Sequence, residues 1–314
     1  MRGSVLRIIM PNLKPLIPKS LRPGSRIGIA APAGHFNPDK FVAGIKVLED
    51  HGFEPFIPSR LITRKGYLAG GDIHRAEVIQ RLFADLSVDA ILCARGGYGS
   101  MRILPLLDYA AIRRNPKIFI GFSDITALLT VLYTHCSLVT YHGPVVTSLG
   151  MASPQTGAAL TAAVSCDRRI VIEPEPQNGF VLKQGAAVGP VIGGNLTILS
   201  HLVGTPFMPR YDGHILFLED CGEKPYRIDR MLTQMRLSGC LHGIVGLLLG
   251  EFKECGSLDM IKEIVADIFQ DMEIPIIGGF EIGHGRTNLT LPIGLSAKLD
   301  TRSRQLSYQE PAIS

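Results

Sequence analysis

The sequence predicts an α/β protein with two domains, and three observations support this prediction. Apolar strand-like runs alternate with helix-like segments along the chain, which is typical of parallel sheets covered by helices. The 34 glycines and 21 prolines show no regular period, so they are expected to mark the ends of many elements. The chain has 314 residues, more than the ~100–200 of one ordinary domain, and 46% of them are hydrophobic, enough for a full core.

The first half of the chain predicts strands and helices in alternation. The pair Asn37-Pro38 is typical of a helix start, because the amide accepts a backbone N–H and proline suits the first turn. Apolar residues at helical spacing extend this helix and predict a second one: Phe41, Ile45 and Leu48, then Ile73, Ala76, Ile79 and Phe83. Strands are predicted at residues 26–31, 88–94 and 117–122, and a helix at about 124–133.

The second half alternates in the same way after a less patterned stretch at residues 151–184. Within that stretch, Glu173-Pro174-Glu175-Pro176 is similar to a linker. Helices are expected after Gly193-Gly194-Asn195 and at 226–237 and 258–269, strands at 215–218, 244–250 and 274–277, and β-type alternation over 289–307. We therefore predict an N-terminal α/β domain at 1–155, a linker at 156–185 and a C-terminal α/β domain at 186–314.

Composition and charge argue against several classes of partner. A formal charge of +4 gives no reason to expect nucleic acid or an anionic membrane, and no apolar stretch reaches the ~18–20 residues that span a bilayer. The six cysteines form no CxxC pair, and HExxH and GxGxxG motifs are absent, so we expect no metal and no cofactor. Residues 1–11 lack the apolar core of a secretory signal, so we expect a soluble, cytoplasmic protein.

The strongest chemical signal lies at residues 118–126, where an apolar strand runs through Gly121 and Ser123 directly into a helix. A serine at such a sharp turn projects its hydroxyl from the backbone, and the helix N-terminus offers N–H groups to an oxyanion. Ile125 replaces the second glycine usual in this pattern. Ser123 could also be the N-cap of an ordinary helix, so the local pattern leaves both roles open.

A nucleophilic serine needs a base and a carboxylate that orients the base. His284 follows an apolar run and is flanked by glycines that leave the imidazole room; His142 is the second candidate. Each could instead be a histidine that hydrogen-bonds to the backbone. Glu219 and Asp220 end an apolar strand, where they could serve a site or cap the next turn.

The glycine-rich run Arg95-Gly96-Gly97-Tyr98-Gly99 also follows a strand. Glycine lets backbone N–H groups approach a ligand closely, so this run could bind a phosphate or donate to an oxyanion.

Seven short motifs occur in order between about residues 26 and 295: IAAPAG (29–34), ARGGYG (94–99), GFSDIT (121–126), GGNL (193–196), LED (218–220), YRIDR (226–230) and GHG (283–285). Together they resemble the LD-carboxypeptidase family, the muramoyltetrapeptide carboxypeptidases, which have the microcin self-immunity peptidases as close relatives.

The resemblance implies a serine peptidase with Ser123 as nucleophile, His284 as base and Glu219 as the orienting acid. It implies an N-terminal parallel-sheet domain similar to class I glutamine amidotransferases and a smaller C-terminal α/β domain, with the site between them. The implied reaction removes the terminal D-alanine of murein tetrapeptide during peptidoglycan recycling in the cytoplasm. A homodimer is also implied.

Acyl-transfer chemistry then predicts oxyanion donors at the backbone N–H groups of Asp124 and of Gly96 or Gly97. A carboxypeptidase also binds a free carboxylate, for which arginine is suited. The candidates for substrate contacts are Arg95, Asn195, Arg227 and Arg230, although each arginine could instead pair with Asp220 or Asp229.

Two alternative functions remain open from the sequence. The first is cleavage of an aminoacyl-nucleotide toxin, as in the microcin relatives, although the chain has no Trp to stack on a base. The second is a non-catalytic two-domain protein that binds a ligand in its cleft.

Overall fold

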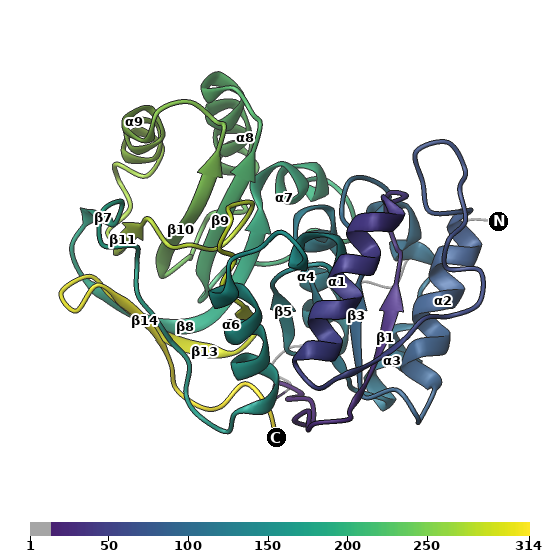
Figure 1. Cartoon of the computed structure of the whole chain (residues 1–314). Coiled ribbons are helices and arrows are strands. Elements are labelled where there is room, and N and C mark those ends of the chain that lie inside the picture. Colours follow the sequence, from purple (N-terminus) through teal and green to yellow (C-terminus); the bar gives the residue numbers. More distant parts are fainter. Residues whose placement is uncertain (1–13) are drawn as a thin grey trace.

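The computed structural model of the protein describes residues 14–314, which form two β-sheets and the helices around them (Figure 1). Residues 1–11, in which we expect no secretory signal, lie outside this described part. The mixed α/β fold predicted from the sequence is confirmed, with two sheet-containing domains.

Among the described residues, the first sheet has six strands in the order β12-β5-β4-β3-β1-β2. All neighbours are parallel except β12, which comes from the C-terminal part of the chain and is antiparallel to β5. The strands are β1 (Arg26–Ala30), β2 (Glu54–Phe56), β3 (Ala90–Cys93), β4 (Ile118–Gly121), β5 (Thr140–His142) and β12 (Leu291–Ile293). The strands predicted from the three apolar runs are confirmed.

Both faces of the first sheet are covered by helices. Alternate residues of a strand point to opposite sides, so neighbouring residues of one strand pack against different helices. Leu92 of β3 packs in the same cluster as Phe41 of α1 (Pro38–Asp50), whereas Ile91 packs with Ile79 of α2 (Asp72–Ala84). The remaining helices of this half are η1 (Ser100–Leu106), α3 (Tyr109–Arg114), η2 (Ser123–Ile125), α4 (Thr126–Cys136) and α5 (Val146–Leu149). The predicted parallel sheet with helices on both faces is confirmed.

Two details of the helices test the sequence patterns. Asn37 caps α1 as predicted, since its Oδ1 accepts a 3.0 Å hydrogen bond from the Lys40 backbone N–H. Ile73, expected to share the apolar face of α2, is instead 69% exposed. It lies in the first turn of α2, and the helix buries Ala76, Ile79 and Phe83.

Among the described residues, the second sheet has eight strands in the order β6-β14-β13-β8-β9-β10-β11-β7. Its centre, from β8 to β11, is parallel, and the outer strands are antiparallel. The strands are β6 (Val171–Ile172), β7 (Phe180–Lys183), β8 (Ala186–Asn195), β9 (Ile215–Cys221), β10 (Gly246–Lys253), β11 (Ile276–Gly278), β13 (Ser296–Asp300) and β14 (Gln305–Tyr308). Its helices are α7 (Leu196–Leu202), α8 (Pro225–Leu237) and α9 (Leu258–Ile268), as predicted.

Residues 156–185, predicted to be a linker, contain regular structure. They include most of α6 (Pro154–Ser165) and two strands, β6 and β7, that lie at the two edges of the second sheet. The buried residues of this helix are Thr156, Gly157, Leu160, Ala163 and Val164, of which Thr156 is polar and Gly157 has no side chain, so its apolar periodicity is weak in the sequence. Because β12 also returns to the first sheet, the chain crosses between the sheets more than once. The predicted domain limits at 155 and 186 stay a prediction.

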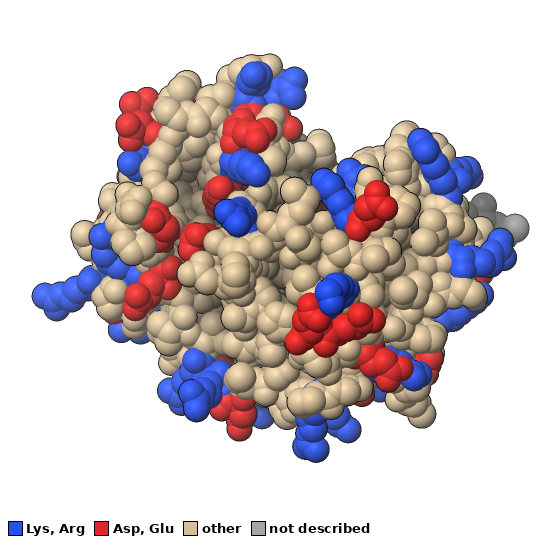
Figure 2. All heavy atoms as spheres, in the orientation of Figure 1, with Lys and Arg blue, Asp and Glu red and all other residues tan. Residues whose placement is uncertain are grey.

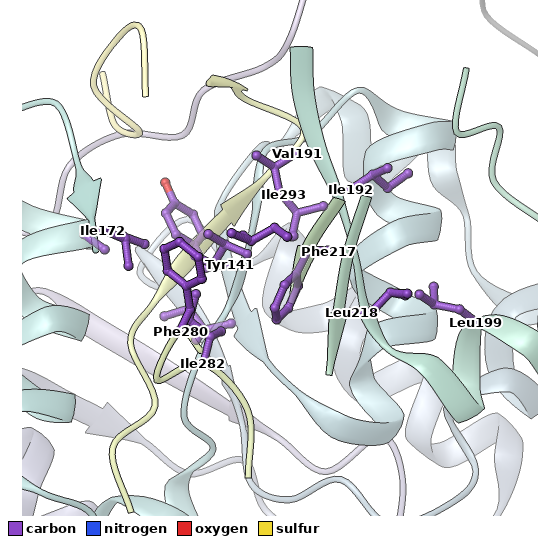
Figure 3. Close-up of a cluster of buried hydrophobic side chains, with 14 of the residues drawn as sticks. Tyr141, Ile172, Val191, Ile192, Leu199, Phe217, Leu218, Phe280, Ile282 and Ile293 are labelled. Atoms are coloured by element: carbon purple, nitrogen blue, oxygen red, sulfur yellow. The ribbon is translucent and has the colours of Figure 1, made fainter. Parts of the chain in front are cut away.

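A continuous core joins the two sheets, as Figure 3 shows. Tyr141 of β5 and Ile293 of β12 belong to the same buried cluster as Val191 of β8 and Phe217 of β9. Residues contributed by both sheets are therefore held in a fixed relation by packing.

The surface has mixed charge, and in Figure 2 Lys and Arg alternate with Asp and Glu over the visible face. Within residues 14–314, no helix is both long and apolar enough to cross a membrane. In the same part of the chain, no three His, Cys, Asp or Glu side chains are grouped to hold a metal ion.

Candidate active site

Ser123 lies at a strained turn between β4 and α4. Its backbone has φ of +62°, in the left-handed region that a residue with a side chain rarely adopts. A Cβ on Gly121 would lie 2.7 Å from Ile125, so the strand and the helix approach closely only because residue 121 is glycine. Among the described residues, no hydrogen bond from the Ser123 side chain caps the helix. The capping role considered for Ser123 therefore has no support in the contacts.

His284 and Glu219 form a close pair on the second domain. Nδ1 of His284, in the loop after β11, lies 2.7 Å from Oε2 of Glu219 near the end of β9. Glu219 is fully buried, and the His284 side chain is 20% exposed. A Cβ on Gly283 would lie 2.7 Å from the same Oε2, so the loop reaches the carboxylate because residue 283 is glycine.

The pKa values of Glu219 and His284 are shifted in the opposite directions that an ion pair produces. Burial alone would raise the pKa of Glu219, but the imidazoles of His142 and His284 hold it below its ordinary 4.5. Burial alone would lower the pKa of His284, but the hydrogen bond and the charge of Glu219 raise it above 6.5. Both shifts favour the charged pair of imidazolium and carboxylate.

Ser123 and His284 line one cavity of about 1100 Å³. The ring of Phe122, next to Ser123, lies 4.8 Å from the ring of His284. Gly96 and Gly97 line the same cavity. The fold thus brings together a serine from the first domain, a histidine–glutamate pair from the second and a glycine loop.

The glycine loop lies directly against the Ser123 turn. The Asp124 carboxylate accepts a 2.8 Å hydrogen bond from the Ser100 backbone N–H, and the Ser100 hydroxyl donates back to the Asp124 carbonyl. Among the described residues, none accepts a backbone hydrogen bond from the N–H of Gly96, Gly97 or Asp124. These N–H groups are free to bind a ligand.

The four residues predicted to contact substrate lie in different places. Arg95 lines the cavity, with one guanidinium N–H donated to the His35 carbonyl at 2.6 Å. Asn195 is buried outside the cavity lining, where it caps α7 and donates to Asp220 at 3.0 Å. The substrate contact predicted for Asn195 stays a prediction; in this structure its amide is bonded within the protein.

Arg227 and Arg230 lie on α8 and do not line the cavity either. Arg227 pairs with Glu223 at 3.3 Å, not with Asp220 or Asp229, and Arg230 lies over the Tyr226 ring. Their predicted substrate contact likewise stays a prediction; the motif that contains them belongs to helix α8.

Three further cationic residues line the cavity and are not among the predicted site residues: Lys40, Lys253 and Arg286. Lys253 donates to the His284 carbonyl at 3.2 Å. No Asp or Glu lines the cavity among the described residues, so its charged lining is entirely basic. The position of Arg286, two residues after His284, is a signal that could have been used; Lys253 carries no such signal.

His142, the second candidate base, lies behind the pair rather than in the cavity. It is fully buried, and its Nε2 lies 3.9 Å from Oε1 of Glu219. It therefore faces the carboxylate oxygen that His284 does not use.

Comparison with known proteins shows the family. The description "LD-carboxypeptidase N-terminal domain" matches residues 27–143, and "LD-carboxypeptidase C-terminal domain" matches residues 188–299. The chain is 36% identical over 295 residues to the "probable murein peptide carboxypeptidase" of Bacillus subtilis, covering 91% of this chain and 92% of that protein. It is 32% identical over 286 residues to the murein tetrapeptide carboxypeptidase of Pseudomonas aeruginosa, covering 88% and 93%.

Solved structures agree with the fold. The structure of MccF in complex with glutamyl sulfamoyl guanosine matches with a TM-score of 0.88 and 26% identity, covering 96% of this chain and 100% of that one. MccF of Escherichia coli is named as the microcin C7 self-immunity protein.

These findings define the chain as a serine-type peptidase that acts as a carboxypeptidase. More specifically, the chain belongs to the LD-carboxypeptidase family. The resemblance seen in its seven motifs is confirmed.

Proposed function

We propose that the protein removes the terminal D-alanine from murein tetrapeptide in the cytoplasm, during peptidoglycan recycling. The observation that carries this proposal is the 2.7 Å His284–Glu219 hydrogen bond beside a cavity that Ser123 also lines. The names of the relatives from Bacillus subtilis and Pseudomonas aeruginosa support a murein peptide as substrate.

The proposed mechanism has an acyl-enzyme intermediate. Ser123 Oγ attacks the carbonyl of the diamino acid while Nε2 of His284 takes the hydroxyl proton. Glu219 holds Nδ1 of the ring, which leaves Nε2 free as the base, and it stabilises the imidazolium that forms. His284 then gives the proton to the amine of the departing D-alanine. A water molecule, deprotonated by His284, hydrolyses the ester and returns Ser123 to its resting form.

The oxyanion of each tetrahedral intermediate is assigned to backbone N–H groups. Among the described residues, the N–H groups of Asp124, Gly96 and Gly97 donate to no competing backbone carbonyl. A Cβ on Gly96 would lie 3.1 Å from Ser123 Oγ, so this loop approaches the proposed nucleophile closely. Loss of one such donor typically costs about 10²–10³ in kcat.

We assign the free carboxylate of the substrate to the basic lining of the cavity. Within residues 14–314, Arg286 has no ion pair, whereas Arg95 already donates to a carbonyl. A guanidinium binds a carboxylate through two parallel hydrogen bonds, which suits a carboxypeptidase. Arg286 is the proposed main contact and Arg95 the second.

The decisive experiment is incubation with murein tetrapeptide and analysis for tripeptide and free D-alanine. We expect Ser123→Ala to abolish release and to prevent labelling by a serine-directed phosphonate. Ser59→Ala, at an exposed loop position, is the matched control and should behave like wild type. Undiminished release by the Ser123 variant would overturn the proposal.

A second candidate function is supported by the match to MccF, whose structure contains glutamyl sulfamoyl guanosine. The cavity of about 1100 Å³ has room for a substrate larger than a terminal amino acid. Incubation with an aminoacyl sulfamoyl nucleotide separates the two functions: turnover of this compound but not of tetrapeptide favours the second. The homodimer and the likeness of the first domain to class I glutamine amidotransferases stay predictions; light scattering tests the former.

A further inference from the structure

His142 is the most unusual buried polar group outside the proposed triad. It ends β5, where it is paired with Gly121 of β4, and it is fully buried. Among the described residues, neither ring nitrogen has a hydrogen-bond partner. A buried imidazole without partners is costly, so its position calls for a compensating interaction.

The carboxylate oxygen that faces His142 also lacks a hydrogen-bond partner. Oε1 of Glu219 is buried, and within residues 14–314 it accepts no hydrogen bond, whereas Oε2 is bonded to His284. His142 Nε2 lies 3.9 Å from this Oε1. The distance exceeds that of a hydrogen bond, so the two groups interact as a charge with a dipole or with a second charge.

Packing fixes the direction in which the His142 ring points. The ring lies edge-on to Phe122 at 6.0 Å and to Phe217 at 5.0 Å, with interplanar angles of 75° and 78°. Phe122 precedes Ser123 in the first domain, and Phe217 lies on β9 two residues before Glu219. The ring is therefore held between the two domains with Nε2 toward the carboxylate.

We propose that His142 is a positioning residue that presents a protonated Nε2 to Oε1 of Glu219, and so holds this carboxylate in place for His284. The inference rests on the proposed function of the Ser123–His284–Glu219 set. A bare Nε2 would turn its lone pair toward an anionic oxygen, which is unfavourable in a buried site. With a proton on Nε2, both carboxylate oxygens face a donor, one from each domain.

The other charged groups near Glu219 do not replace this role. Asp220 and Glu251 are themselves carboxylic acids, whose pKa values burial raises, and Lys253 reaches the His284 carbonyl instead. His142 is therefore the donor group that the first domain supplies to the carboxylate.

The first test determines the protonation of the ring directly. A two-bond ¹⁵N–¹H correlation spectrum of ¹⁵N-histidine-labelled wild-type protein at neutral pH, assigned with the His142→Gln variant, should show a proton on Nε2 of His142. A proton on Nδ1 only would overturn the inference. This measurement needs no substrate, so it stands even if tetrapeptide is not cleaved.

The second test compares two variants that keep different properties of the ring. His142→Phe keeps the aromatic packing and removes the donor, whereas His142→Gln keeps a donor near Nε2 and removes the packing. We expect His142→Phe to lower kcat for D-alanine release about tenfold or more, with KM changed less than about twofold. His142→Gln should restore a substantial part of kcat.

A purely structural role predicts the opposite order, with the Phe variant the more active of the two. That order would overturn the inference, as would equal kcat for His142→Phe and wild type. Circular dichroism checks that both variants fold. Failure of the wild-type enzyme to release D-alanine or to be labelled at Ser123 would instead refute the proposed function, and the two failures are thus distinguishable.

Discussion

Gly96→Ala tests the proposed contact between the glycine loop and the nucleophile. A methyl group at residue 96 would lie 2.9 Å from Ser123 Cβ, 3.1 Å from Ser123 Oγ and 3.2 Å from the Phe122 carbonyl. Carbon atoms pack best at about 3.5–4.0 Å, so the loop or Ser123 must move by roughly 0.6 Å. Because a misplacement of about 1 Å costs roughly 10²-fold in rate, we expect kcat/KM to fall about tenfold.

The fold should tolerate this change. Overpacking of this kind typically costs about 1–3 kcal/mol, and each 1 kcal/mol lowers Tm by about 2–4 °C in a domain of 150–250 residues. The assay measures D-alanine release and the rate of phosphonate labelling at Ser123, together with a thermal melt. The control is Gly71→Ala, because a Cβ there meets no atom within 4 Å and φ is −70°.

Two results would refute the reasoning. The first is a Gly96→Ala enzyme whose kcat/KM stays within about twofold of wild type, because the close contact between residue 96 and Ser123 would then not affect the rate. The second is an equal loss in the Gly71 control, which would show a general sensitivity to added methyl groups.

The same geometry leads to four further predictions. Because Glu219 raises the pKa of His284 above 6.5, kcat/KM should fall as pH drops through that raised value, and Glu219→Gln should move the midpoint to lower pH in a pH–rate profile. The lowered pKa of Glu219 contributes stability above pH 4.5 that is lost as the pH falls below this value. In the Glu219→Gln variant, Tm should therefore depend less on pH below 4.5 than in the wild type. Arg286→Ala should raise KM for tetrapeptide about tenfold or more, and Arg227→Ala, outside the cavity, should leave KM unchanged. Asn195→Ala should lower the free energy of unfolding in urea by about 1–3 kcal/mol, because it removes a cap and a buried hydrogen bond; an unchanged midpoint would contradict this.

Local signals in the sequence determined most of the elements. The cap at Asn37, the apolar runs of β3 and β4 and the glycine before Ser123 act on neighbouring residues, so they can be recognised without the fold. Such signals are weak in α6, whose buried face includes Thr156 and Gly157. They misplaced Ile73, which has the spacing of a core residue but is exposed.

Contacts between distant residues were decided only by the tertiary structure. Glu219 and Asp220 are neighbours on β9 and look equivalent in the sequence. In the strand they point to opposite sides, so Glu219 meets His284 while Asp220 bonds to Asn195. A serine turn, a histidine loop and a strand that ends in carboxylates can all be recognised from local sequence.

The tertiary structure decided which arginines face the cavity and where His142 lies. Arg286 lines the cavity and Arg227 does not, although only the latter belongs to a recognisable motif. The physical reason is that a local pattern depends on residues one helical turn or one strand apart. The charge and partners of a site depend instead on side chains that two packed sheets bring together from distant parts of the chain.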